Sequence, residues 1–279
     1  TKVKLAVPSP SNRVTVYVVG GPREVRSLSG DGNRFLRGFY IPRAGGSLAV
    51  VPRVNSAGSD ADLSMVVLLH EYAHHFLTAS SGWPMPRWLS EGAAEFFSST
   101  SFHADGSISI GGPARHRAGD LFLATDVTAA DLLDPTQYEQ RPKRSYDAFY
   151  GKSWLLYHYL TFEKARAGQL GAYAKLLSQG KSMREAGLEA FGDFSVLERD
   201  LDRYLTRIRM GVFVLKPEML KIAPTVIRRL SAGEAAILPV RIRSTLGVDD
   251  EQAKALLAQA RPIAARFPAD AAAQAALAE

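Results

Sequence analysis

The stretch His-Glu-Tyr-Ala-His-His-Phe at residues 70–76 decides how the rest of this sequence is interpreted. His70 and His74 are four residues apart, and Glu71 directly follows the first histidine. On an α-helix, residues i and i+4 project from the same face, one turn apart. Two imidazoles held in this way can bind one Zn²⁺ through ring nitrogens at about 2.0–2.1 Å. The stretch therefore predicts a helix that carries part of a metal site.

The residues before this stretch support a helix. Residues 60–69 are apolar and compatible with a helix, and Ser59 and Asp62 have the spacing of a capping box. We therefore expect the first helix over residues 60–78. The arrangement His-Glu-x-x-His on a helix is the pattern of zinc-dependent peptidases, in which the glutamate serves as a general base.

A second helix is expected over residues 87–99, where the sequence contains Trp-Leu-Ser-Glu-Gly-Ala-Ala-Glu-Phe. Glu91 and Glu95 are one turn apart, so one face of this helix offers two carboxylates. A catalytic zinc site takes three protein ligands and leaves the fourth position open. His70, His74 and Glu91 complete such a set. Glu95 is placed to accept a hydrogen bond from the far nitrogen of a ligating histidine, which fixes the tautomer and the ring orientation.

The remaining titratable residues near the motif are interpreted by their position. Glu71 is expected to reach a metal-bound water, but not the metal, and to act as the general base; the alternative is a solvent-exposed helix residue. His75 points about 100° around the helix from its neighbour, which favours a surface position or a contact with a ligand. His103, His116 and His158 are isolated in the sequence, and no role is expected for them.

Together, HEYAH and WLSEGAAEF resemble the gluzincin zinc metallopeptidases of the peptidase MA-like superfamily, over about residues 14–210. The resemblance implies an α+β fold in which a small N-terminal β-sheet lies beside a zinc-binding active-site helix and a glutamate helix. In that family the glutamate of W-L-x-E-G is the third zinc ligand, and it falls on Glu91. Sixteen residues separate His74 from Glu91, slightly fewer than in thermolysin-like and aminopeptidase members, which predicts a short loop over 78–89.

The resemblance also implies a donor for the oxyanion that forms on the scissile carbonyl. Related peptidases commonly use a tyrosine or histidine from a later helix. Tyr150 is the preferred candidate and Tyr146 the other one, and both would otherwise be ordinary core residues. The implied activity is hydrolysis of a peptide bond in a peptide or protein substrate, with one Zn²⁺ per chain.

Strands are expected on both sides of the two helices. Residues 14–19 are predicted to form a buried strand, and Gly20-Gly21-Pro22 ends it. Residues 35–42 and 47–54 are predicted to pair as a hairpin. In related peptidases an edge strand before the zinc helix binds the substrate backbone, and here it would lie within 47–54; a purely structural hairpin is the alternative. The alternating pattern over 101–112 predicts another hairpin.

The peptidase domain is expected to cover residues 1–215, with the sheet and the zinc helices in 1–100 and a mostly helical subdomain in 101–215. Residues 128–140 are predicted to form a short helix followed by a loop, with Asp134-Pro135 as the breaker. Further helices are predicted at 146–167, about 169–179, 183–191 with Ser182 as cap, and 196–210 with Ser195 as cap.

From Pro217 the sequence changes character. Residues 216–248 contain scattered prolines without a clear period and are predicted to form a connector. Residues 249–279 are rich in alanine, and their two predicted helices, broken at 267–270, resemble a tetratricopeptide helical hairpin. A single such unit cannot bury its own apolar face. We therefore expect this unit to pack on the peptidase domain or the native chain to continue beyond Glu279, and a protein partner could bind these helices.

Composition excludes several classes of protein. The 279 residues include no cysteine, which excludes disulfides and thiolate metal sites. No apolar run approaches the length of a membrane span. The net charge of +6 arises from scattered basic residues without a nucleic-acid-binding module, which favours a solvated surface over a nucleic-acid partner. The compartment stays open; a secreted or periplasmic location is favoured, with any signal segment absent from this chain.

The sequence thus predicts a zinc metallopeptidase domain with a helical C-terminal extension. The main alternative is a catalytically weak or inactive peptidase-like scaffold that acts through its helical repeat region. A protein whose interactions depend mainly on tetratricopeptide-like repeats, and a hydrolase of a non-peptide amide, are two further alternatives.

Overall fold

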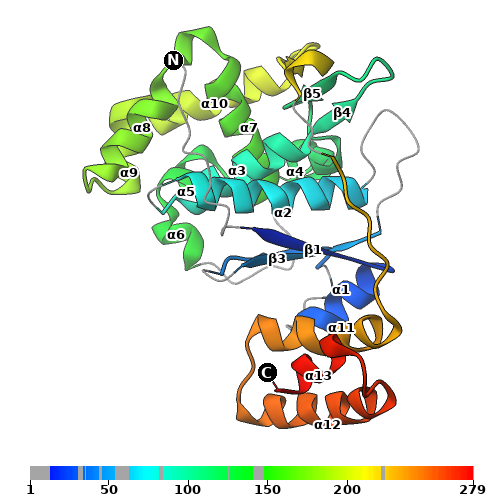
Figure 1. Cartoon of the computed structure of the whole chain (residues 1–279). Coiled ribbons are helices and arrows are strands. Elements are labelled where there is room, and N and C mark those ends of the chain that lie inside the picture. The colour runs from blue at the N-terminus through cyan, green and yellow to red at the C-terminus, as the bar shows by residue number, and fades with distance from the viewer. Residues whose placement is uncertain are drawn as a thin grey trace.

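The computed structural model describes residues 13–30, 34, 36–43, 46–53, 63–81, 84–124, 126–140, 148–220 and 224–278. The fold is mixed α+β, with many helices and two small sheets (Figure 1), and the α+β expectation is therefore confirmed at this level. The expected capping box of Ser59 and Asp62, and the candidate Tyr146, lie outside the described residues.

The first sheet has the strand order β1 (Val14–Val19), β3 (Ser47–Pro52), β2 (Phe39–Ile41). β3 is parallel to β1 and antiparallel to β2, so the predicted strand and hairpin are confirmed. The predicted burial of the first strand is wrong, because each residue of β1 is half-buried or exposed. All six residues of β3 are buried. The expectation of a substrate-binding edge strand within 47–54 is wrong, because β3 is the central strand and neighbouring strands pair with both of its edges.

Helices cover both faces of this sheet (Figure 1). α2 (Leu63–Ser80) lies on one face, and α1 (Pro22–Ser29) and α11 (Ala232–Leu246) lie on the other. The shared apolar core on the second face consists of Val25, Leu28, Leu48, Val50 and Ile242. The sequence interpretation missed α1, because it assigned Gly20-Gly21-Pro22 only to the end of a strand. Pro22 is the first helical residue, a position where its missing N–H costs nothing.

The glutamate helix α3 (Arg87–Ser98) packs between α2 and α7 (Phe149–Phe162). Gly92 permits its close approach to α7. A Cβ atom on Gly92 would lie 2.4 Å from the carbonyl oxygen of Ser153, well inside van der Waals contact. Because Gly92 directly follows Glu91, this contact holds the glutamate-bearing turn of α3 at a fixed place in the core.

The central part of the chain is mostly helical, as predicted for 101–215, and encloses the largest apolar core. It begins with the predicted hairpin of β4 (Thr100–Phe102) and β5 (Ile108–Ile110), to which β6 (Phe213–Leu215) adds a third, unpredicted strand. The helices are α4 (Ala118–Phe122), α5 (Ala129–Leu133), α6 (Pro135–Glu139), α7, α8 (Gln169–Ser178), α9 (Met183–Phe191) and α10 (Phe194–Leu205), with 3₁₀ turns at Arg115–Arg117, Lys164–Arg166 and Pro217–Met219.

The loop predicted after Asp134-Pro135 is wrong, because Pro135 is the first residue of α6, a position that proline favours. Ser182 caps α9 in a complete capping box, as predicted. The expected cap at Ser195 is wrong, because the carboxylate of Asp193 accepts hydrogen bonds from the backbone N–H groups of Ser195 and Val196 and starts α10 earlier. Asp193, two residues before Ser195, is itself of a residue type favoured at the N-cap.

The predicted connector over 216–248 is wrong for its second half, which forms α11. Ser231 caps this helix through the backbone N–H of Glu234, and Pro239 lies inside it. The predicted break between the last two helices is confirmed, since α12 (Asp250–Arg266) precedes α13 (Ala271–Ala278). α11 packs against both, around a core of Ile237, Val240, Leu256 and Ala260. The apolar face of the hairpin is therefore covered within this chain.

None of the described helices combines the length and the apolar character that a membrane span requires.

His158, for which the sequence suggested no role, lies in the core of α7 and is fully buried. Its Nε2 lies 2.9 Å from the carbonyl oxygen of Gly111 and 3.1 Å from that of Gly211, so Nε2–H donates to these carbonyls. Its Nδ1 lies 2.9 Å from the Tyr204 hydroxyl, which therefore donates to it. Burial is the main cause that lowers the pKa of His158 to about 4.

We predict that His158 makes the fold less stable in weak acid. An unfolded histidine has a pKa near 6.5, so between about pH 6.5 and pH 4 the unfolded chain binds a proton that the folded chain excludes. The free energy of unfolding should therefore fall as the pH falls through this window, by up to about 3 kcal/mol.

Urea unfolding of the metal-free protein between pH 7.5 and pH 4 would measure this effect. The variant His158→Gln should show a smaller loss of stability in that window, whereas His103→Gln, at an exposed histidine, should follow the wild type. An equal pH dependence in all three proteins would contradict the prediction.

Candidate metal centre

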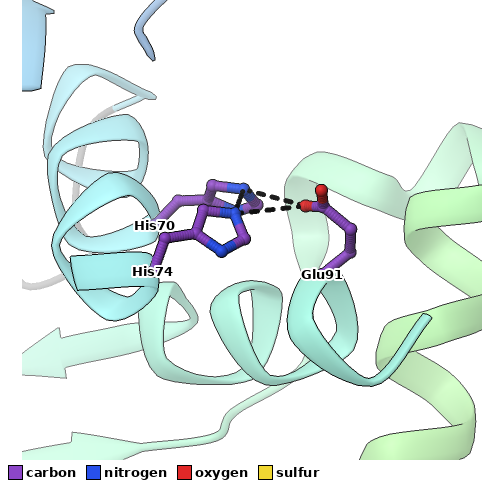
Figure 2. Close-up of side chains that lie close together, drawn as sticks. All are labelled: His70, His74 and Glu91. Carbon is purple, nitrogen blue, oxygen red and sulfur yellow. Dashed lines mark hydrogen bonds and ion pairs between the residues drawn. The ribbon is translucent and has the colours of Figure 1, made fainter. Parts of the chain in front are cut away.

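Two neighbouring helices bring together three side chains whose donor atoms could hold a metal ion. His70 and His74 project from α2 toward α3, and Glu91 projects from α3 toward them (Figure 2). The two Nε2 atoms are 3.1 Å apart, and Oε2 of Glu91 lies 3.3 Å from each of them. These three donor atoms form a nearly equilateral triangle, and the group could hold a metal ion.

The charges in this group favour a cation. Burial opposes protonation of His70, but its contacts with Glu91 and then Glu95 outweigh that effect and raise the pKa of His70 to about 10. Burial likewise opposes ionisation of Glu91, yet its contacts with His70 and His74 lower the pKa of Glu91 to about 2. Oε2 of Glu91 is buried, and among the described residues its polar partners are these two histidine nitrogens. A positive charge at this point, carried by a proton or a metal ion, therefore stabilises the site.

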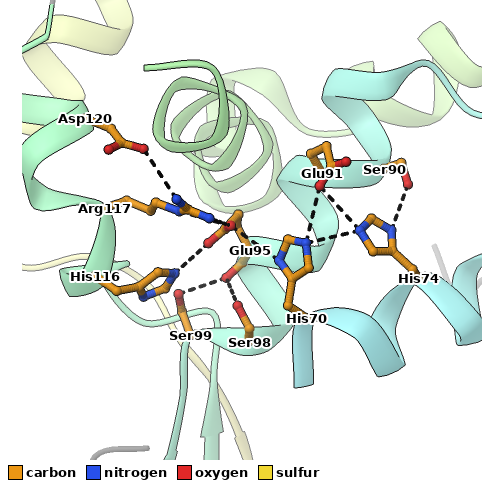
Figure 3. A network of polar contacts seen from close by, with 10 residues as sticks. All are labelled: His70, His74, Ser90, Glu91, Glu95, Ser98, Ser99, His116, Arg117 and Asp120. Atoms are coloured by element: carbon orange, nitrogen blue, oxygen red, sulfur yellow. Dashed lines mark hydrogen bonds and ion pairs between the residues drawn. The ribbon is translucent and has the colours of Figure 1, made fainter. Parts of the chain in front are cut away.

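Glu95 lies behind His70, at the place that the sequence interpretation gave it. Nδ1 of His70 is 3.3 Å from Oε1 of Glu95, whose side chain is completely buried (Figure 3). Two further donors hold this carboxylate: Nε2 of His116 lies 2.6 Å from Oε2, and Nε of Arg117 lies 3.0 Å from Oε1. Burial raises the pKa of Glu95, but its contacts with His116, His70 and Arg117 outweigh burial and keep this pKa well below its usual range. The sequence interpretation missed both donors, because no spacing relates them to Glu95.

Ser90 is a second contact that the sequence interpretation missed. Nδ1 of His74 lies 3.1 Å from the Ser90 hydroxyl, so both histidines have a polar partner on the nitrogen that faces away from Glu91 (Figure 3). The signal was present in the sequence, since Ser90 directly precedes Glu91 on a helix already assigned to the site.

His75 is buried, so the expected surface position is wrong. The hydroxyl of Tyr40 donates a hydrogen bond of 3.0 Å to Ser47, and it accepts one from Nδ1–H of His75 at 3.1 Å. This contact joins α2 to strands β2 and β3. His75 therefore has a role in holding the site helix against the sheet.

Glu71 is half-buried on α2, next to His70, and makes no hydrogen bond or ion pair with any residue that the structure describes. The pKa of Glu71 is raised, chiefly by burial, although the neighbouring His70 and His74 oppose this effect. The backbone of Gly38, just before β2, crosses this part of α2. A Cβ atom on Gly38 would lie 2.2 Å from Val67 Cγ1 and 3.7 Å from Glu71 Cγ. The chain therefore passes close to Glu71 only because residue 38 is glycine.

Tyr150 lies at the start of α7, beside His70. The centre of its ring is 6.2 Å from that of His70, and the guanidinium carbon of Arg117 is 4.8 Å from it. The pKa of Tyr150 is raised, chiefly by burial, although the nearby Arg87 opposes this effect. The structure thus brings Tyr150 to the site, whereas Tyr146 lies outside the described residues.

Comparisons with known proteins give no match for this chain: no protein-family model matches it, and neither do any curated proteins or solved structures. This is a mixed α+β protein in which two packed helices present a candidate His-His-Glu metal centre.

Proposed function

We propose that this protein is a zinc-dependent metallopeptidase of gluzincin type, which hydrolyses peptide bonds in a peptide or protein substrate. The observation that carries the proposal is the convergence of His70, His74 and Glu91 from two adjacent helices, with the carboxylate of Glu71 next to the first histidine.

The donor atoms fit zinc in kind and in spacing. Catalytic zinc sites often use two histidines and a glutamate, and leave a fourth position open. Bonds of about 2.0–2.1 Å in a tetrahedral arrangement place neighbouring donor atoms about 3.3–3.4 Å apart. The three separations here are 3.1, 3.3 and 3.3 Å. Two nitrogen donors and one carboxylate oxygen also favour zinc over magnesium or calcium, which prefer oxygen ligands.

In the proposed mechanism, zinc held by these three residues supplies Lewis-acid polarisation of the carbonyl and activation of water. Glu71 accepts a proton from the attacking water and passes it to the leaving amine. Tyr150 donates a hydrogen bond to the developing oxyanion. Glu95 and Ser90 each hold the far nitrogen of one ligating histidine, which fixes the orientation of both rings.

The sheet offers a place for an extended substrate backbone. Among the described strands, β2 is at one end of the first sheet, and Gly38 immediately before it lies against Glu71. Extended peptides commonly bind by adding a strand to an exposed sheet edge. We therefore propose β2, in place of β3, as the strand that aligns the substrate with Glu71.

The test combines metal analysis with a cleavage assay. The purified full chain should contain about one zinc per chain, the stoichiometry of a single three-ligand site, and should cleave an unfolded protein or a mixed peptide library. Chelation should abolish cleavage, and Zn²⁺, but not Mg²⁺, should restore it. Zinc without cleavage of any peptide would favour the peptidase-like scaffold or a hydrolase of another amide. No zinc after reconstitution at neutral pH would overturn the proposal.

A further inference from the structure

The Glu95 carboxylate is held by three side chains, and all three are more than twenty residues from it in sequence. His70 approaches from α2, whereas His116 and Arg117 approach from the 3₁₀ turn that precedes α4 (Figure 3). The two donors of the turn divide the carboxylate between them. His116 binds Oε2, and Arg117 binds Oε1, the same oxygen that faces His70.

This division fixes the plane of the carboxylate. A carboxylate on a flexible side chain can rotate about its last bond, and one donor on one oxygen would not prevent that rotation. Donors on both oxygens define one orientation, with Oε1 directed at Nδ1 of His70. Because the Glu95 side chain is completely buried, its charge also requires paired, hydrogen-bonded partners in order to remain there.

Arg117 contacts a second residue of the site. Its guanidinium carbon lies 4.8 Å from the centre of the Tyr150 ring, and its Nη1 lies 3.9 Å from Oδ2 of Asp120 in α4. Arg117 therefore contacts both Glu95, which lies behind the proposed ligand His70, and the ring of Tyr150, which lies beside His70.

We propose that Arg117, together with His116, is a positioning residue that sets the zinc affinity of the site through Glu95 and His70. The two donors fix the carboxylate of Glu95, which in turn fixes the tautomer and the ring plane of His70, so that Nε2 is presented toward the other two ligands. The proposal rests on the proposed zinc centre, but it does not depend on peptidase activity.

The test measures zinc affinity by competition with a chromogenic chelator, for the wild type, Arg117→Gln and Arg117→Lys. Loss of a group that orients a metal-binding histidine typically weakens metal binding about 10–100-fold, and this range is expected for Arg117→Gln. Arg117→Lys keeps the charge but loses the geometry of the guanidinium, so it should recover part of the affinity.

Arg166 provides the matched control. It forms a partly buried ion pair of 2.7 Å with Asp200, within the helical subdomain. Arg166→Gln should lower the melting temperature, as Arg117→Gln does, yet keep the zinc affinity of the wild type. Equal weakening of zinc binding in both variants would mean that lost stability is the cause, and it would overturn the proposal. Wild-type affinity in Arg117→Gln would also overturn it.

A second measurement covers the case in which Arg117→Gln does not fold. His116→Gln removes the other donor, and it should likewise weaken zinc binding and shift the visible absorption bands of the Co²⁺-substituted protein. Unchanged affinity and unchanged bands in this variant would overturn the proposal. Failure of the proposed peptidase function gives a different result: zinc affinity depends on Arg117, but no peptide is cleaved. A wild-type chain that binds no zinc would overturn both proposals.

Discussion

Replacement of Glu71 by glutamine is expected to lower kcat/KM for peptide cleavage about 10²–10⁴-fold, the contribution of a positioned general base. Glutamine has nearly the shape of glutamate but cannot accept the proton of the attacking water. The zinc content should remain that of the wild type, since the three proposed ligands are His70, His74 and Glu91. The variant therefore separates proton transfer from metal binding.

The surroundings of Glu71 make this substitution informative. Glutamine at this position keeps the size of the side chain and removes only the electrostatic interaction of the carboxylate with its neighbours, chiefly His70 and His74. Glu251→Gln, at an exposed position of α12, is the matched control and should behave as wild type. Wild-type turnover in Glu71→Gln would contradict the role of general base. Loss of zinc from this variant would instead indicate that Glu71 supports the metal site.

The sequence could predict the three candidate ligands because their relationship is local. Helical spacing alone places His70 beside His74 and Glu91 beside Glu95, and the motifs indicate that the two helices belong together. The structure adds what spacing cannot contain, namely the packing of α3 against α2 and α7. That packing depends on Gly92, where a side chain would collide with the backbone of Ser153.

The groups that hold Glu95 could not be predicted in the same way. His116 and Arg117 follow Glu95 by 21 and 22 residues and lie on a 3₁₀ turn without helical periodicity. Only the tertiary fold decides which buried carboxylate they meet. The same limit applies to α11, where scattered prolines without a clear period suggested a connector, although burial against α12 and α13 favours a helix.

Glu91→Ala is expected to weaken zinc binding strongly. Loss of a residue that only orients a ligand typically costs about 10–100-fold in affinity, and loss of a ligand itself should cost more. Oε2 of Glu91 lies 3.3 Å from each histidine nitrogen and is the one anionic donor of the proposed set. Without it, two neutral imidazoles remain, and the charge that favours a cation at this point is lost. Peptide cleavage should be abolished with the zinc.

Thermal unfolding provides a readout of this variant that does not require a substrate. A ligand that binds only the folded chain stabilises it by about 4 kcal/mol at a free concentration of 1,000 Kd. Added Zn²⁺ should therefore raise the Tm of the wild type by several degrees, but should leave that of Glu91→Ala almost unchanged. Glu91→Gln keeps the size of the side chain and removes its charge, so it distinguishes a lost ligand from a new cavity. If both variants keep the wild-type response to Zn²⁺, Glu91 is not a ligand, and the third donor must come from another residue.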